Sequence, residues 1–228
     1  MPKLRLLPLG TVIKCKDPAP GWEKLRFMVV GYFPIARETR ECFDYVMAPW
    51  PLGYVNYEDG TRKRFYSCNE DAIERIEFLG AVDEELKKAT DWFYQDAIER
   101  ADSSSPIASG VASMVESLGD LKASTGNFPP NSDLLPLGSV VSTVSDGDRK
   151  MMIYQHSGTA DGEYFDYGIC NWPEGVDPGS GKIGLIKQEE ITAVHFRGYE
   201  NALSQELAKR LEKKRRGSLF SRIFGKRR

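Results

Sequence analysis

The chain repeats itself, and this duplication limits its fold more than any other feature does. Residues 6–13 return as 134–141, residues 26–30 as 149–153, residues 43–53 as 165–175, and residues 73–80 as 191–198. The order is kept, while the offset falls from 128 to 118, which places the deletions between the blocks, where loops are expected. Four ordered blocks in 228 residues indicate two divergent copies of one small domain.

The repeated blocks have the composition of strands. Leu-Pro-Leu-Gly reads as a turn that leads into the β-branched run Thr11–Ile13 or its counterpart Ser139–Val141. Proline lacks the N–H that a sheet ladder needs, so we expect each Trp-Pro-x-Gly element to form a turn whose Trp covers one end of the core. In residues 193–197, apolar and polar side chains alternate as in a half-buried strand. Each copy should then form a small, mainly antiparallel sheet or partial barrel.

Amphipathic helices are expected after each copy. Leu86, Ala89, Phe93 and Ala97 share one helical face in the first, and the second repeats this spacing with Leu203, Leu207 and Leu211. The predicted class is α+β, with two tandem sheet domains that are each covered by a helix. We place the first repeat domain at 1–101, a linker at 102–133, the second repeat domain at 134–216 and a basic amphipathic tail at 217–228.

The linker contains apolar residues at helical spacing between two Ser- and Pro-rich ends. These residues are Ile107, Val111, Met114, Val115 and Leu118. The short amphipathic helix that they predict either packs between the two domains or docks a helical partner, and packing is the favoured interpretation.

Charge is unevenly distributed along the chain. Residues 209–228 hold ten Lys or Arg and one acid, so they carry +9, while the rest carries -11 within a net charge of -2. An acidic body does not fit a protein that binds nucleic acid over its whole surface.

No stretch reaches the roughly 18 apolar residues of a membrane span, and the N-terminal apolar run is too short for a signal peptide. We therefore expect a cytoplasmic location. We also expect no metal and no other cofactor.

No catalytic motif stands out. The two histidines, His156 and His195, have no companion cluster, and none of the four cysteines has metal-binding spacing. Asp44 and Asp166 lie between Phe and Tyr in both copies, and each either lines a ligand site, faces solvent or caps the Trp-Pro turn. The structural roles are favoured, and with no catalytic residue assigned we predict a protein that is not an enzyme.

The tail combines apolar and basic residues in a helical pattern after Gly217-Ser218, which should end the preceding helix. Its candidate partner-binding residues are Leu219, Phe220, Arg222, Ile223, Phe224, Lys226, Arg227 and Arg228. Such a segment can dock on a protein partner, fold back on the acidic body, lie on an anionic membrane at the inner membrane face, or bind nucleic acid. Protein docking or self-docking is favoured, the membrane comes next, and nucleic acid is the least expected partner.

The blocks also carry a family resemblance, strongest in the second copy. Its signature combines an Asp-Tyr strand with a Trp-Pro-x-Gly turn, and in the two copies it comprises Asp44, Tyr45, Trp50, Pro51, Gly53, Asp166, Tyr167, Trp172, Pro173 and Gly175. With the closing Gly198-Tyr199, this pattern resembles the bacterial family called domain of unknown function 4176, whose members tend to occur near type VII (WXG-type) secretion genes. The first copy departs at Gly80-Ala81. The resemblance implies an accessory, chaperone-like or immunity protein for secreted toxins and supplies no catalytic residues.

Four functional hypotheses remain at this point. The first is a non-enzymatic, protein-binding adaptor or chaperone-like protein, linked to type VII secretion of a toxin or helical substrate. The second is an immunity protein that neutralises a cognate toxin. The third is a small-ligand-binding or enzymatic domain pair with a cleft around Asp44 or Asp166, and the fourth is nucleic-acid binding through the tail.

Overall fold

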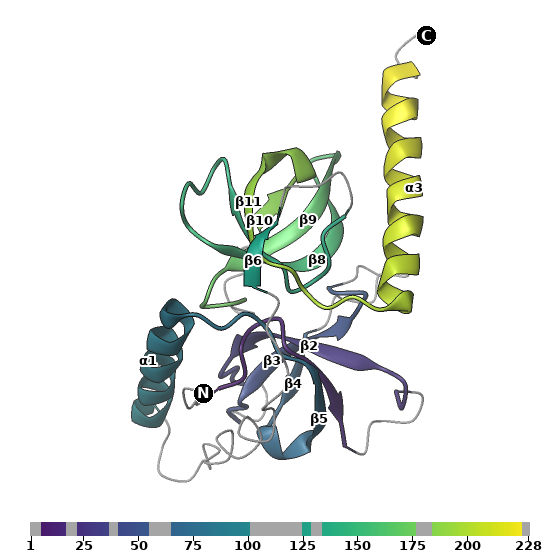
Figure 1. The fold of residues 1–228 in the computed structure, drawn as a ribbon. Coiled ribbons are helices and arrows are strands. Elements are labelled where there is room, and N and C mark those ends of the chain that lie inside the picture. Colours follow the sequence, from purple (N-terminus) through teal and green to yellow (C-terminus); the bar gives the residue numbers. More distant parts are fainter. Residues whose placement is uncertain are drawn as a thin grey trace.

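In the residues that it describes, the computed structural model contains two antiparallel sheets, built mainly from one copy each, and two long helices (Figure 1). It describes residues 6–16, 22–36, 41–54, 65–100, 125–128, 134–176 and 184–224. The first sheet has the order β4-β3-β2-β1-β5, and the second has the order β10-β9-β8-β7-β11-β6. The strands of the first sheet are β1 (Val12–Cys15), β2 (Arg26–Tyr32), β3 (Tyr45–Trp50), β4 (Tyr66–Cys68) and β5 (Ile73–Phe78). Those of the second are β6 (Thr125–Phe128), β7 (Val140–Thr143), β8 (Met151–Ala160), β9 (Glu163–Asn171), β10 (Gly184–Ile186) and β11 (Ile191–Phe196).

The predicted α+β class is therefore confirmed, with two tandem units of the same topology. The sheets are open rather than closed into barrels, because each ends in edge strands. A short 3-10 turn, η1 (Glu70–Ala72) or η2 (Gln188–Glu190), leads into the last strand of each copy.

Hydrogen bonds fix which residues of the two copies are equivalent and correct one block of the alignment. Gly10 N–H donates to Val29 O at 2.8 Å, and Gly138 N–H donates to Ile153 O at the same distance. Val29 is therefore equivalent to Ile153, and Arg26 to Lys150 rather than to Arg149. The sequence alignment was one residue out here because Met-Met in the second copy can match Met28 in two ways. By the same register His156 is equivalent to Tyr32.

The helices follow the sheets as expected, but α3 differs from its predicted face and end. On α1 (Glu84–Arg100), Leu86 and Ala97 are buried and Phe93 packs against the core, as predicted. On α3 (Ala202–Phe224), Leu203 is 62% exposed, while Ser204 is buried and Ala208 packs on the core. Leu211 packs against the core as predicted, so the inward face of α3 agrees with the prediction there and departs from it at Leu203.

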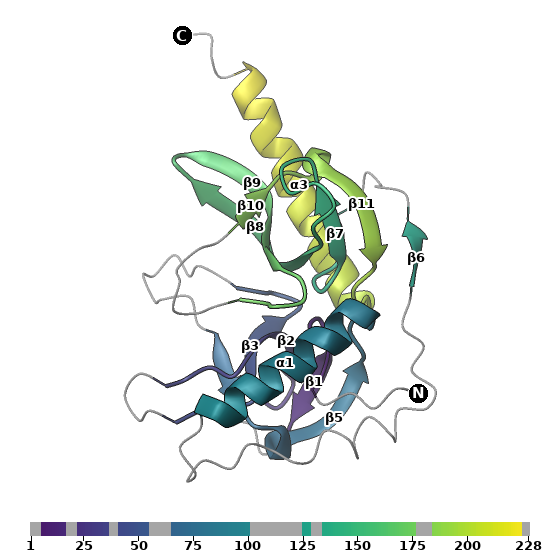
Figure 2. The same ribbon diagram turned by 90° about the vertical axis from the view of Figure 1, so that its left-hand side faces the viewer.

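The Gly217-Ser218 pair does not end α3, which continues to Phe224. Glycine disfavours a helix interior by only about 1 kcal/mol, and the flanking residues are good helix formers. The C-terminal end of α3 extends past both sheets in the two views (Figure 2).

The linker contributes a strand that the sequence did not indicate. Within the predicted linker at 102–133, Thr125–Phe128 form β6, which adds antiparallel to the outer edge of β11. The predicted helix at Ile107, Val111, Met114, Val115 and Leu118 lies outside the described residues.

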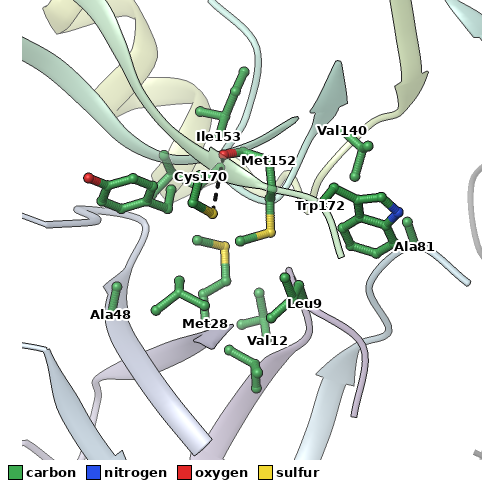
Figure 3. Packing of buried hydrophobic residues seen from close by; sticks show 14 of the residues in the cluster. Leu9, Val12, Met28, Ala48, Ala81, Val140, Met152, Ile153, Cys170 and Trp172 are labelled. Carbon is green, nitrogen blue, oxygen red and sulfur yellow. Dashed lines mark hydrogen bonds between the residues drawn. The ribbon is translucent and has the colours of Figure 1, made fainter. Parts of the chain in front are cut away.

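The two copies share one hydrophobic core rather than two separate ones. Figure 3 shows Met28 and Met152, which are equivalent, facing each other across the middle of this core, with Leu9 and Val12 from the first copy and Ile153 and Val140 from the second around them. Gly10 and Gly138, also equivalent, approach so closely that a Cβ on Gly10 would lie 3.1 Å from Gly138 O. Glycine is required here because the two backbones meet.

Candidate functional site at the junction of the two copies

The repeated Asp-Tyr pair is bonded to the backbone of its own copy. The Asp44 carboxylate accepts a hydrogen bond from Glu70 N–H at 2.8 Å, and the Asp166 carboxylate accepts one from Gln188 N–H at 2.8 Å. The neighbouring hydroxyl of Tyr45 accepts the N–H of Leu7, as the Tyr167 hydroxyl accepts that of Leu135. Both aspartates thus cap the 3-10 turn before the last strand, not the Trp-Pro turn that was one of the predicted alternatives.

A second repeated contact joins the Leu-Pro-Leu-Gly turn to the end of the last strand. The hydroxyl of Thr11 accepts Gly80 N–H at 3.1 Å, and that of Ser139 accepts Gly198 N–H at 3.0 Å. A Cβ on either glycine would lie 2.0 Å from a carbonyl oxygen of that turn. These polar residues therefore stabilise the scaffold of each copy.

The repeated Trp-Pro-x-Gly element makes the junction between the copies. Gly53 forms an antiparallel bridge with Gln155, and Gly175 forms the equivalent bridge with Gly31. Both signature glycines have positive φ, +71° and +82°, and a Cβ on either would lie within 2.6 Å of a carbonyl oxygen in the other copy. The element is a turn, as predicted, and it closes on the opposite copy.

Aromatic side chains complete this junction from both sides. Trp50 is 3% exposed and packs against Tyr199 of the other copy, with the rings tilted by 30° and their centroids 4.9 Å apart. Its equivalent, Trp172, is 2% exposed and lies beside Ala81 in Figure 3. The equivalent residues Phe78 and Phe196 meet at 5.8 Å, so the contact is nearly symmetric except at Ala81 and Tyr199.

A small recess opens at the junction beside α3. Its volume is about 40 Å³, room for a few water molecules. It is lined by Trp50, Pro51, Leu134, Pro136, Leu137, His156, Glu200, Ser204, Gln205 and Ala208. A site of this size holds solvent or one small group rather than a metabolite.

His156 is the only ionisable ring in this recess, and its equivalent in the first copy explains its state. Its Nε2 lies 2.8 Å from Leu135 O, just as the Tyr32 hydroxyl donates to Leu7 O at 3.0 Å. A carbonyl only accepts, so Nε2 carries the proton, and Nδ1 has no partner among the described residues. Burial lowers the pKa of His156, against the opposing effect of the Leu135 bond. The ring is therefore a neutral structural donor, as Tyr32 is.

The remaining histidine is also engaged. His195 Nε2 lies 2.8 Å from the Ser142 hydroxyl, and burial lowers the pKa of His195. Its equivalent Glu77, correctly aligned from the sequence, forms ion pairs with Arg26 at 2.6 Å and Arg75 at 2.8 Å.

A buried carboxyl that the sequence did not single out distinguishes the first copy. Glu70 is 5% exposed, and its Oε2 has no hydrogen-bond partner among the described residues. Burial, with the nearby carboxylates of Asp44 and Asp71, raises the pKa of Glu70 to about 7. The equivalent residue is Gln188, whose side-chain oxygen accepts the Tyr167 hydroxyl. The glutamine was the available signal, because it marks a position that favours an uncharged group.

One ion-pair cluster crosses the junction. Lys150 Nζ lies 2.6 Å from Asp83 and 3.0 Å from Glu85, both at the start of α1 in the other copy. Burial would raise the pKa of Asp83, but Lys150, the Leu86 N–H and the Trp172 indole hold it below its usual value.

Large apolar side chains remain exposed away from the junction. Trp92 on α1 is 61% exposed, Leu203 on α3 is 62% exposed, and Val144 after β7 is 70% exposed. Trp92 occupies the position of Arg210 in the second copy, so this surface differs between the copies.

The predicted tail residues are only partly described. Leu219, Phe220, Arg222, Ile223 and Phe224 lie in the last turns of α3, whereas Lys226, Arg227 and Arg228 lie outside the described residues. Among the described residues, no group of three His, Cys, Asp or Glu side chains could hold a metal ion, and no helix is long and apolar enough to cross a membrane.

The fold and the junction define a tandem protein made of two copies of one open-sheet α+β domain. The chain belongs to the family described as domain of unknown function 4176 (DUF4176), whose model matches residues 6–88 and 134–207. The two matched regions correspond to the two copies. No curated protein and no solved structure gave a significant match.

Proposed function

We propose that this chain is a non-enzymatic accessory protein that binds a protein client, as an adaptor or chaperone-like partner of a type VII secretion substrate or toxin. One observation carries the proposal: the polar side chains common to both copies are bonded to their own backbone. Asp44, Tyr45 and Thr11, with their equivalents, all bond to main-chain N–H groups. The duplicated feature is therefore a scaffold, and the surfaces around it differ between the copies.

The surface of α1 is the first place where we expect the client. Trp92 is large, exposed and adjacent to Phe93, which it meets edge-on at 5.3 Å. Tryptophan is enriched among the residues that dominate the energy of protein interfaces. The link to type VII secretion is supported by family membership alone, through the gene neighbourhoods in which such domains tend to occur.

The test is a pull-down in which the full chain is co-expressed with the products of adjacent genes. The variant Trp92→Ala should reduce client affinity roughly tenfold or more, whereas Val144→Ala, at a position 70% exposed in the second copy, should not. A chain that ends at Arg216 tests whether the basic C-terminal end of α3 also contributes to client binding. Loss of the client with this truncation alone would make the helix end the docking element.

The outcome also separates the alternatives. A bound toxin whose activity is neutralised, with rescue of cells that express it, would assign the immunity role. If no adjacent product binds any form, the client proposal fails, and anionic vesicles become the next probe of the end of α3.

A further inference from the structure

The two copies differ at one sheet edge. In the second copy, β6 covers the outer edge of β11 in antiparallel register, with Phe128 opposite Val194 and Thr125 opposite Phe196. In the first copy, no described strand pairs with the outer edge of β5, so β5 ends the sheet.

The inner edges of these two strands are the same. Phe78 and Ile76 of β5 pair with Val12 and Ile13, just as Phe196 and Val194 of β11 pair with Val140 and Val141. Both pairings shift register at the equivalent positions. The outer edge of β5 therefore presents its backbone groups in the arrangement that β11 offers to β6.

The side chains along the two edges differ in charge. Glu74, Arg75 and Glu77 of β5 stand where β11 has Thr192, Ala193 and His195. On β5 these residues form an ion-pair network with Lys14 and Arg26. Its three cations are Lys14, Arg26 and Arg75, and its two carboxylates are Glu74 and Glu77. Arg75 is the most exposed member, with 54% of its side chain open. An added strand with an acidic residue near Arg75 would balance this charge.

We infer that the edge of β5 receives an extended strand from the protein client, antiparallel to β5, with an aromatic residue opposite Ile76 followed by an acidic residue near Arg75. This inference rests on the proposed function, because it says how the client binds. Strand addition satisfies the open N–H and C=O groups of an edge, and the side chains along it select the partner. The pairing of β6 with β11 sets the direction and the register.

A peptide in which residues 122–128 of the chain are followed by Asp-Glu is the probe, added to the full-length protein. Hydrogen exchange at 73–78 should slow when the peptide binds, while exchange at 191–196 stays unchanged. N-methylation at one of the two alternating sets of peptide nitrogens should weaken binding roughly tenfold per hydrogen bond lost, and methylation of the other set should not.

Charge reversal tests the acidic requirement. Arg75→Glu should weaken the acidic peptide roughly five- to tenfold and strengthen a version that ends in Lys-Lys. The matched control is Arg210→Glu on α3, where an arginine whose side chain is 75% exposed lies away from the edge. If neither peptide responds to Arg75→Glu, the acidic part of the inference is wrong.

The remaining outcomes keep this inference separate from the proposed function. Protection confined to 191–196 would mean that the peptide displaces β6, and no protection at either strand would mean that β5 takes no strand; both results overturn the inference. If a co-expressed client then binds wild type and Arg75→Glu equally, the client proposal survives alone. If the peptide protects β5 but no adjacent gene product binds, strand addition stands and the client proposal falls.

Discussion

The two copies keep the same contacts to backbone but differ where side chains meet side chains. Thr11 and Ser139 bond equivalent glycines, and Asp44 and Asp166 cap equivalent turns. In contrast, Tyr32 is replaced by His156, and Glu70 by Gln188. The contacts that hold each sheet and its turns together are therefore common to both copies, and the differences lie at positions where side chains meet other side chains.

The junction between the two copies is also built from equivalent residues. Equivalent residues meet each other, as Gly10 meets Gly138 and Phe78 meets Phe196, which is the pattern of a two-fold, self-complementary interface. The duplicated chain thus reproduces within one polypeptide the geometry of a symmetric dimer. Changes at equivalent positions should have equal effects where the junction is symmetric and unequal effects where it is not.

The largest effects are expected at the signature glycines. Gly53→Ala and Gly175→Ala should each lower the free energy of unfolding by at least about 3 kcal/mol, because each Cβ meets a carbonyl of the other copy and the backbone φ is positive. Urea denaturation measures both. Gly147→Ala is the control, since its φ is also positive but nothing lies within 4 Å, so it should lose only about 1 kcal/mol. Equal losses at Gly147 and Gly175 would contradict the close approach.

Tyr199 tests the asymmetric part of the junction. Tyr199→Ala gives the second copy the residue of the first, and it removes a ring that contacts Trp50 and Phe78. We expect a loss of about 2–3 kcal/mol in urea denaturation. The reciprocal Ala81→Tyr should not add the same amount, because Ala81 is buried and its surroundings are packed for a methyl group. A gain of similar size would show that the junction is symmetric there too.

Glu70 and Gln188 give a prediction with a defined pH dependence. The pKa of Glu70 is about 7 in the folded protein against an ordinary value of 4.5, so ionisation of this carboxyl opposes folding. The penalty is absent below about pH 4.5, grows as the pH rises towards 7, and is complete above it. Glu70→Gln should therefore stabilise the protein by about 1–3 kcal/mol at pH 8 and by little at pH 4.

The reciprocal change completes this test. Gln188→Glu should destabilise the protein above pH 7 and less at pH 4, because the side-chain oxygen of Gln188 is half-buried and accepts a hydrogen bond from the buried Tyr167. Thermal unfolding at the two pH values measures both variants. A stabilisation by Glu70→Gln that does not change with pH would mean that the effect comes from packing rather than from charge.

The sequence predicted the parts of the fold that leave a periodic or a repeated trace. The duplication, the α+β class, the strands within the repeated blocks and α1 followed from Leu-Pro-Leu-Gly, from Trp-Pro-x-Gly and from the spacing of Leu86 and Phe93, whereas the short strands β4 and β10 were not predicted. The strand β6 could not be predicted, because Thr-Gly-Asn-Phe is too short and has no alternating pattern. The continuation of α3 through Gly217 was missed, since a glycine lowers helix propensity without forbidding a helix.

The candidate site was predicted less well than the fold. The signature residues were correctly selected, but their role at the junction depends on which backbone lies opposite Gly53 and Gly175, and a single sequence carries no such pairing. The sequence did not indicate Glu70, because two adjacent acidic residues, Glu70 and Asp71, are typical of a solvent-exposed turn. Only the folded arrangement, with Asp44 beside it, shows that the carboxyl is buried.

The smallest expected effect concerns the one ion-pair cluster seen to cross the junction in the described residues. Lys150→Gln should lower the free energy of unfolding by at most about 1 kcal/mol, and by less in 1 M salt, since Lys150, Asp83 and Glu85 are partly exposed and screened.

Asp83→Asn is the matching change, because the equivalent residue Asn201 already caps α3 through its side-chain oxygen, as Asp83 caps α1 at Leu86 N–H. The asparagine should therefore keep the cap and remove only the charge. If the pair acts across the junction, the double variant should lose less than the sum of the two single losses, and the difference should shrink with salt. Additive losses would mean that Lys150 acts within its own copy, as its equivalent Arg26 does with Glu77.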